Sequence, residues 1–277
     1  MKILMEMMSY PFLVRALAVG VLVSLCASLL GSSLVLRRYS MIGDSLSHVG
    51  FAALAAAYPL GFSPLYIAVP VCVAAAFLLL RIRDSSRISG DAATALLCSG
   101  SLAVGVMTIS LTTGMNTDVC NYMFGSILAM SPEDVRLSVT LSAAVLLLFT
   151  AFYNRIFAFT FDETFAAATG TDTGLCSMLL AVLTAVTVVL GMRMMGTLLI
   201  SSLIVFPSLT AMRVCRRFLS TVLLSGALAV ACFLAGLVFS YRFAVPTGAC
   251  IVIMNMMLFL IFCLAERIRM RAGKERS

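Results

Sequence analysis

Long uninterrupted apolar runs fill most of this chain, and they constrain its fold more than any other feature. Nine such runs follow one another, at residues 11–36, 41–60, 64–81, 91–111, 135–153, 174–191, 195–212, 218–240 and 246–265. A helix needs roughly 20 apolar residues to cross a bilayer, whereas the strands of an outer-membrane barrel alternate in polarity. The pattern therefore predicts an all-α, polytopic transmembrane helical bundle of about nine spans, forming one domain over residues 1–277.

The composition excludes several other classes of protein. Of the 277 residues, 62% are hydrophobic and 11% are charged. In an average soluble domain, about 45–50% of the residues are apolar and about 25% are charged. Disordered chains have low hydrophobicity and high charge, and the spans leave no room for a soluble catalytic domain. The sequence has no GxxxxGK[ST] phosphate-binding loop, and its single histidine rules out HExxH. We therefore expect a protein that is not an enzyme, and any ATP hydrolysis must occur on another chain.

The basic side chains orient the spans. With nine spans, 14 of the 19 Lys and Arg residues fall on one side of the membrane and five on the other. The excess marks the cytoplasmic side, so the sequence predicts an outside N-terminus and a cytoplasmic C-terminus. The same bias explains the net charge of +7 without a nucleic-acid partner. The first apolar run is too long for the core of a signal peptide, so we expect no cleavable one.

An aspartate and the only histidine stand near the start of the second run, in MIGDSLSHVGFAAL. Asp44 and His48 are four residues apart, so a helix places them on one face about one turn apart. An ionisable side chain within a span costs about 2.5–3.5 kcal/mol on insertion scales and indicates function. A carboxylate and an imidazole at this spacing suit a shared Zn²⁺ or Mn²⁺ ion. The alternative is a helix-start acid favoured by the helix dipole, with a buried histidine nearby.

Residues 156–172, on the predicted cytoplasmic side, have the pattern of a short amphipathic helix that ends near Gly170. Asp162 and Glu163 lie in this segment, where the orientation rule favours basic residues. Docking to another protein and a solvated surface loop both account for these acids.

Residues 112–134, on the opposite side, contain the short apolar piece 122–130, which is too short to cross and suits an interfacial or re-entrant helix. Asp118, Glu133 and Asp134 are expected here as solvated charges that attract cations or a partner.

Most of the nine cysteines lie inside apolar runs and form no CxxC pair, so we expect them to be small buried hydrophobes. Cys120, in a predicted outside loop, is the expected exception. Asp91 begins a run and is expected to be a helix-start acid. A further group of small residues suits close helix packing; it comprises Gly191, Gly196, Ser201 and Ser202.

Four stretches resemble the membrane permeases of zinc and manganese ABC importers, the ZnuB/MntB-like family. GDSLSH at 43–48 is similar to the family motif GD-x-[LS]-x-H. Matching pieces follow in order at 118–135, 161–172 and 192–211, and the resemblance covers nearly the whole chain. The stretch MSPED is closer to zinc permeases than to manganese ones.

The resemblance implies an ABC importer permease fold and the membrane-spanning half of a high-affinity, ATP-driven metal importer. Such a permease lies in the bacterial inner membrane and pairs with a second copy of itself. Its other partners are an ABC ATPase subunit, which binds ATP, and an extracytoplasmic metal-binding protein. No covalently bound cofactor is implied, and the cargo would be Zn²⁺, with Mn²⁺ or iron as alternatives.

The resemblance also implies roles for individual residues. Asp44 and His48 match the metal contacts of the family motif. The coupling segment that meets the ATPase is matched by Asp162, Glu163 and Gly170. Binding-protein docking or an outer gate is implied for the segment that contains Asp118, Asn121, Glu133 and Asp134.

Two other classes of protein remain as alternatives to an ABC permease. A transporter or channel driven by an ion gradient predicts more intramembrane acids and an inverted repeat, but one acid is well placed and no clear repeat is found. A membrane metalloenzyme needs three protein ligands and a general base, which a single histidine makes hard to supply.

Overall fold

The computed structural model describes residues 10–57, 64–85, 89–112 and 132–274, and within these ranges it contains helices and no strand. In chain order they are α2 (Pro11–Leu36), α3 (Ile42–Ala57), α4 (Pro64–Ser85), α5 (Gly90–Thr112), α7 (Pro132–Ala151), α8 (Tyr153–Phe161), α9 (Glu163–Ala168), α10 (Thr173–Met195), α11 (Thr197–Val214), α12 (Phe218–Phe243) and α13 (Thr247–Lys274). The predicted all-α fold is confirmed.

Among the described residues, eight helices are long and apolar enough to cross a membrane, namely α2, α4, α5, α7, α10, α11, α12 and α13. The remaining predicted run, 41–60, corresponds to α3. Its 16 residues extend about 24 Å, less than the roughly 30 Å of a hydrocarbon core. α3 nevertheless packs among the long helices, against α4, α5, α10 and α11. The observed helices follow the predicted runs in order and position.

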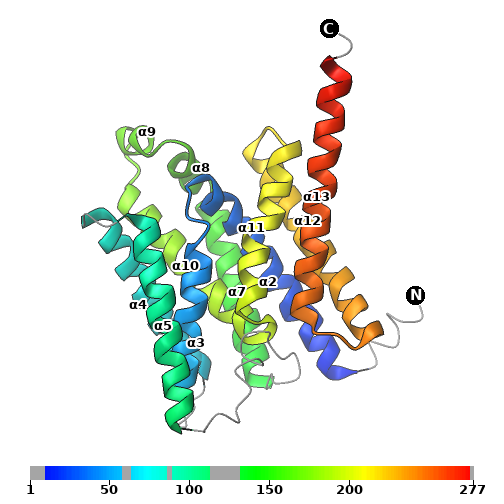
Figure 1. The fold of residues 1–277 in the computed structure, drawn as a ribbon. Helices are drawn as coiled ribbons and strands as arrows, with labels where there is room; N and C mark the ends of the chain where they lie inside the picture. Colours follow the sequence, from blue (N-terminus) through cyan, green and yellow to red (C-terminus); the bar gives the residue numbers. More distant parts are fainter. Residues whose placement is uncertain (1–9, 58–63, 86–88, 113–131, 275–277) are drawn as a thin grey trace.

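Successive long helices run in alternating directions, so their ends gather at two opposite faces of the bundle (Figure 1). In this view α2 begins at the lower end, and α13 ends at the upper end. Arg37 at the end of α2 and Arg213 in the last turn of α11 therefore belong to the upper end. Arg193 and Arg242, in the last turns of α10 and α12, belong to the lower end. The two predicted groups of basic residues are thus separated.

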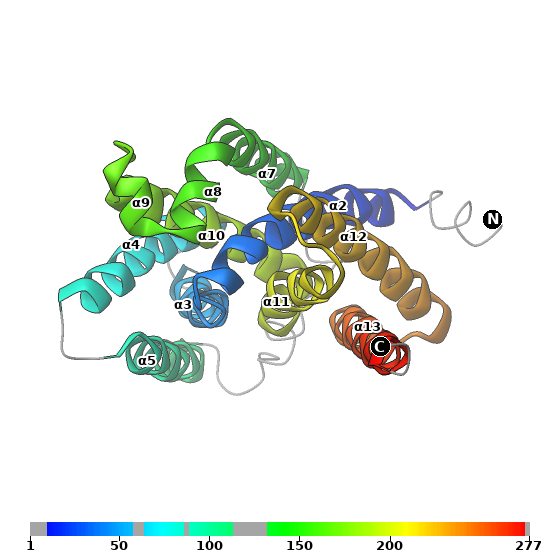
Figure 2. The ribbon, with the colours of Figure 1, turned by 90° about the horizontal axis from the view of Figure 1, so that it is seen from above.

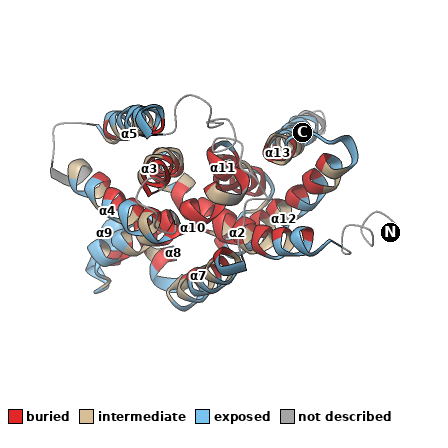
Figure 3. Ribbon diagram, turned by 90° about the horizontal axis from the view of Figure 1, so that it is seen from below, coloured by how far each residue is buried: buried red, intermediate tan, exposed pale blue. Residues whose placement is uncertain are grey.

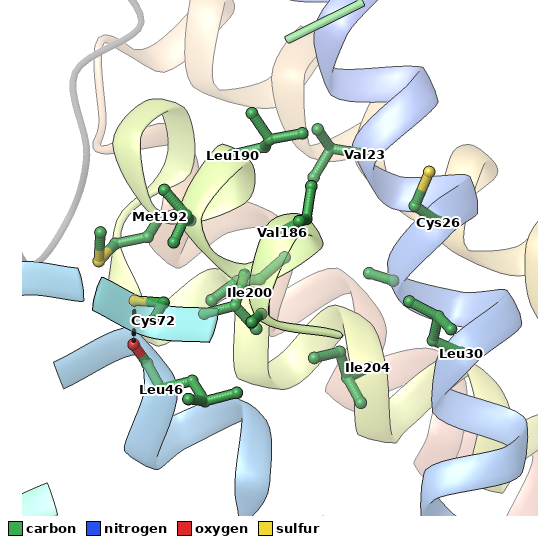
Figure 4. Packing of buried hydrophobic residues seen from close by; sticks show 14 of the residues in the cluster. Val23, Cys26, Leu30, Leu46, Cys72, Val186, Leu190, Met192, Ile200 and Ile204 are labelled. Atoms are coloured by element: carbon green, nitrogen blue, oxygen red, sulfur yellow. Dashed lines mark hydrogen bonds between the residues drawn. The ribbon is translucent and has the colours of Figure 1, made fainter. Parts of the chain in front are cut away.

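α2 and α10 lie at the centre of the bundle, whereas α5 and α13 lie at its edge (Figures 2 and 3). In the apolar stretch of α10, 72% of the residues are buried, against 17% in α5. Val186 and Leu190 of α10 lie close to Val23 of α2, and Ile200 and Ile204 of α11 belong to the same buried cluster (Figure 4). A helix that is apolar on all sides suits this central position.

α3 and α5 run side by side in the same direction (Figure 1). Gly105 of α5 faces α3 so closely that a Cβ there would lie 2.5 Å from the Phe51 ring and 3.2 Å from Cα of Ala52. A small residue lets helix backbones approach in this way. About two turns earlier along both helices, Cys98 of α5 lies beside Asp44 of α3. The close helix contact therefore sets the spacing between Asp44, at the start of α3, and the facing residues of α5.

Residues 156–172 form two short helices, so the prediction of one helix is wrong. α8 ends at Phe161, and Asp162 has an extended backbone with φ −148° and ψ 106°. Its carboxylate accepts a hydrogen bond of 2.9 Å from the amide of Phe165 and caps α9. The break follows from the preference of aspartate for the N-cap position.

The helix end predicted near Gly170 is confirmed. Gly170 has a φ of 83°, which favours glycine. The amides of Gly170 and Thr171 donate to the carbonyls of Ala167 and Ala166 at 3.1 Å and 2.9 Å. This pair of bonds is the Schellman arrangement that closes many helices.

Candidate metal centre

Asp44 and His48 lie on one face of the first two turns of α3. Oδ2 of Asp44 and Nε2 of His48 are 4.0 Å apart, which is too long for a direct hydrogen bond. The side chains are 34% and 13% exposed, respectively. Nδ1 of His48 is buried without a hydrogen-bond partner. The pair therefore presents a carboxylate oxygen and an imidazole nitrogen to the same small volume.

A serine from another helix holds the second oxygen of the carboxylate. The hydroxyl of Ser201, in α11, donates to Oδ1 of Asp44 at 3.2 Å. The sequence predicted Ser201 only as a small residue for helix packing. The structure adds the hydrogen bond from its hydroxyl to Asp44. With Oδ1 engaged, Oδ2 is the oxygen that faces His48.

A third potential metal ligand, Cys98, comes from α5 and was missed by the sequence analysis. Its Sγ lies 3.9 Å from Oδ2 of Asp44, and ligand atoms of Asp44, His48 and Cys98 all lie within 4.8 Å of one another. The prediction that span cysteines are buried hydrophobes is confirmed for Cys26 and Cys72. No local pattern marks Cys98 as different, because 54 residues separate it from Asp44.

The two serines within the motif, between Asp44 and His48, bond to backbone carbonyls three or four residues before them. The hydroxyl of Ser45 donates to the carbonyl of Met41 at 3.0 Å, and that of Ser47 donates to the carbonyl of Asp44 at 2.7 Å. Both side chains are buried. Such bonds satisfy a hydroxyl within a helix, so these serines are weaker candidates for ligands than Cys98.

A cavity of about 480 Å³ lies between α3 and α5, lined by Asp44, Cys98 and Asp91 among others. Asp91 stands in the first turn of α5, as predicted for a helix-start acid. A neighbouring cavity shares Met41, Asp91 and Thr94 with the first one. Because α5 begins at the upper end of the bundle in Figure 1, both cavities, which are lined by its first turns, lie toward that end.

Asp162 and Glu163 lie together at the junction of α8 and α9, also at the upper end (Figure 1). The hydroxyl of Thr164 and the amide of Phe165 donate to the Asp162 carboxylate and hold its pKa below the ordinary value. Glu163 forms an ion pair of 2.6 Å with Arg37, which follows α2. The junction is therefore tied to the bundle by a charged contact.

The four residues predicted for binding-protein docking or an outer gate do not share one environment. Asp118 and Asn121 lie outside the described residues. Glu133 is exposed in the first turn of α7. Asp134 is 5% exposed and forms an ion pair of 2.8 Å with Arg193 of α10. The expectation of a solvated charge at Asp134 is therefore wrong, because a contact between two helices buries it.

Comparison with known proteins identifies a family and several relatives of this chain. The model of the ABC 3 transport family matches residues 9–266. The manganese import system permease protein ScaB of Streptococcus gordonii is 29% identical over 252 residues, which cover 91% of this chain and 90% of ScaB. A probable iron transport system membrane protein of Haemophilus influenzae is 27% identical over 274 residues, covering 97% and 98% of the two chains.

A solved structure has the same fold as this chain. PsaBC from Streptococcus pneumoniae, in complex with Fab, matches with a TM-score of 0.85 and 30% sequence identity, and the match covers 94% of each chain. The helical arrangement in Figure 1 is thus that of a chain in the PsaBC structure.

Proposed function

Because this chain belongs to the ABC 3 transport family and is the membrane permease of a metal ABC importer, we propose that it carries zinc past Asp44 and His48. The observation that carries the proposal is the pair itself, with Oδ2 and Nε2 4.0 Å apart beside an open cavity. A transport site has to bind its ion and also release it. Asp44 at the wall of the cavity, with His48 next to it on the same helix, suits that requirement better than a closed, four-ligand site does.

Zinc is the proposed cargo because the stretch MSPED is closer to zinc permeases than to manganese ones and because the pair includes a nitrogen ligand. Imidazole suits zinc, whereas manganese prefers an environment of oxygen ligands. The names of the relatives favour other metals, since ScaB is named for manganese and the Haemophilus influenzae protein for iron. Manganese is therefore the second candidate. Uptake of radioactive zinc and manganese, measured in competition on the same binding protein, distinguishes the two.

The proposed assembly contains two copies of this chain, with the whole of each chain acting as one permease domain. Two ABC ATPase subunits hydrolyse ATP, and an extracytoplasmic metal-binding protein delivers the ion. The support for a second copy is that the cavity beside Asp44 lies at α5, an edge helix whose surface is mostly unburied in the single chain. A second copy against this edge would enclose the path between two Asp44–His48 pairs.

The proposed orientation places the upper end of the bundle in Figure 1 in the cytoplasm of a bacterial cell. This end carries the larger group of basic residues, which marks the cytoplasmic side of an inner-membrane protein. The N-terminus is then outside and the C-terminus inside. The α8–α9 junction faces the cytoplasm, where Asp162, Glu163 and Gly170 contact the ATPase.

Transport in this scheme is an alternating-access cycle. Asp44 offsets part of the cost of removing water from the ion, because its negative charge replaces water dipoles, and His48 supplies a nitrogen ligand. Closure of the ATPase subunits on ATP moves the α8–α9 junction. The contact of Glu163 with Arg37 passes this movement to α2, and the spans then open the path at the opposite face.

The experiment that tests the proposal uses the complete importer with Asp44→Ala or His48→Ala in the permease. Both variants are expected to lose zinc uptake while they still co-purify with the ATPase. Glu266→Gln is the control, because it removes an acidic charge in α13, outside α3 and the α8–α9 segment, and glutamine can still accept a hydrogen bond from Arg213. Normal uptake by both site variants would overturn the assignment of the path.

A further inference from the structure

Cys98 completes a group of three different ligand types around one point of the proposed path. Its Sγ lies 3.9 Å from Oδ2 of Asp44, and the same oxygen lies 4.0 Å from Nε2 of His48. Ligand atoms on a tetrahedral zinc ion, with bonds of about 2.0–2.3 Å, lie roughly 3.3–3.8 Å apart. Movements of about half an ångström would bring these two distances into that range, and the remaining pair of Cys98 and His48, within 4.8 Å, would close by up to about 1 Å.

The environment of Cys98 differs from that of two other span cysteines. Cys26 and Cys72 are buried, and their thiols donate to backbone carbonyls, each at 3.5 Å. These contacts satisfy the weak thiol donor inside the core (Figure 4 shows the bond of Cys72 to Leu46). The thiol of Cys98 instead donates to a carboxylate, that of Asp44, at 3.9 Å and lines the cavity. Packing alone accounts for Cys26 and Cys72, whereas Cys98 is placed where an ion passes.

We propose that Cys98 is a third protein ligand of the ion in transit and that its sulfur gives this permease a preference for zinc over manganese. This inference rests on the proposed function, since it adds a ligand to the same path. When the ion binds, the S–H bond of Cys98 breaks, a sulfur–metal bond forms, and the proton passes to water. Thiolate is a soft ligand that favours zinc, whereas manganese favours carboxylate and water oxygens.

The helix arrangement supports such a site. Asp44 and His48 come from α3, and Cys98 comes from α5, so the ion would bridge two helices that meet closely at Gly105. Ser201 holds Oδ1 of Asp44 and leaves Oδ2 toward the other two ligands. A relative displacement of α3 and α5 would separate the sulfur from the other ligands. Release of the ion would then follow from the same helix movement that opens the path.

The first test replaces Cys98 with serine in the complete importer and measures zinc and manganese uptake in competition. Serine keeps the size of the side chain and replaces sulfur with oxygen. We expect the ratio of zinc to manganese uptake to fall by roughly tenfold, within the range that changes around a metal site produce. Cys263→Ser in α13 is the matched control, since Cys263 is also partly exposed. This variant is expected to leave the ratio of zinc to manganese uptake unchanged. An unchanged ratio in Cys98→Ser would overturn the inference.

The second test observes the ligand directly, with Co²⁺ alone as the probe. A thiolate bound to Co²⁺ gives a near-ultraviolet charge-transfer band that oxygen and nitrogen ligands do not give. The purified importer and its Cys263→Ser variant are expected to show this band, and Cys98→Ser is expected to lose it. Equal bands in all three proteins would show that the sulfur of Cys98 does not bind the metal.

The two proposals fail in different ways. If Asp44→Ala and His48→Ala retain uptake, the path itself is misplaced. If those variants lose uptake but Cys98→Ser keeps the metal preference and the band, the path stands and Cys98 is not its ligand.

Discussion

Arg37, at the end of α2, joins Glu163, at the start of α9, through an ion pair in which Nη2 lies 2.6 Å from Oε2. Nη1 of Arg37 also donates to the carbonyl of Phe159 at 2.8 Å, and the guanidinium carbon lies 3.8 Å from the centre of the Phe159 ring. The Arg37 side chain is 12% exposed and that of Glu163 is 53% exposed, so the ion pair stands at the surface while the contacts of Arg37 with Phe159 are partly buried. One side chain thus connects a central span to both short helices of the proposed coupling segment.

Replacement of Arg37 with alanine is expected to uncouple transport from ATP hydrolysis. The replacement removes the guanidinium group, and with it the ion pair with Glu163 and the hydrogen bond to the Phe159 carbonyl. Movement of α9 then no longer reaches α2 through a fixed contact. We expect metal uptake to fall several-fold while the ATPase of the complex continues. The measurement compares uptake and phosphate release in proteoliposomes.

Arg213→Ala is the control for this prediction. Arg213 also forms an ion pair of 2.6 Å, with Glu266 of α13, but it lies outside the α8–α9 segment. Similar losses in both variants would show that the effect is a general loss of stability.

Asp162→Ala is expected to weaken coupling, whereas Asp162→Asn is expected to resemble the original chain. Both aspartate and asparagine accept the hydrogen bond from the Phe165 amide that caps α9, and alanine does not.

The same hydrogen bonds predict how the cap depends on pH. Because they lower the pKa of Asp162 in the folded protein, its contribution to stability is complete above the ordinary carboxyl pKa of about 3.9. That contribution is lost only as the pH falls through the lowered value. The measurement is the metal-stimulated ATPase activity at neutral pH, which is expected to be lower in Asp162→Ala than in Asp162→Asn. Equal loss of activity in both variants would contradict the capping role.

Gly105→Ala is expected to disturb the metal path from a distance. A Cβ at this position would lie 2.5 Å from the ring of Phe51, which is buried and has little room to move. Overpacking of this kind costs about 1–3 kcal/mol, and it pushes α5 away from α3, which separates Cys98 from Asp44. Thermal unfolding in detergent and zinc uptake are expected to fall together.

Gly100→Ala serves as the control on the same helix, because a Cβ at residue 100 has no neighbour within 4 Å. This variant is expected to match the original chain in both measurements. A normal Gly105→Ala protein would show that the two helices separate without consequence.

The pair of buried Asp134 and partly buried Arg193 is expected to behave as a unit. Removal of one partner of such a pair leaves an uncompensated charge and costs about 3–5 kcal/mol. Asp134→Leu alone should therefore lower the thermal stability strongly, and the double replacement Asp134→Leu with Arg193→Met should restore much of it. A double-mutant cycle on unfolding temperature tests this, and strictly additive losses would contradict direct coupling.

Much of the fold was predictable because the membrane imposes a strong local requirement. Each span needs a continuous apolar run, and the runs at 11–36 and 218–240 match α2 and α12 to within a few residues. The break at Asp162 was missed because an N-cap depends on a single residue within an otherwise helical pattern. The burial of Asp134 was missed because its partner, Arg193, is 59 residues away in the chain.

The sequence by itself determined the number and order of the apolar segments, the separation of basic residues and the placement of Asp44 and His48 on one helical face. These features depend on residue type and on the local repeat of a helix. Only the tertiary structure decided that Cys98 of α5 and Ser201 of α11 join Asp44 at one point. The physical reason is that contacts between helices depend on how closely the backbones pack, and at Gly105 this depends on side chains of a different helix.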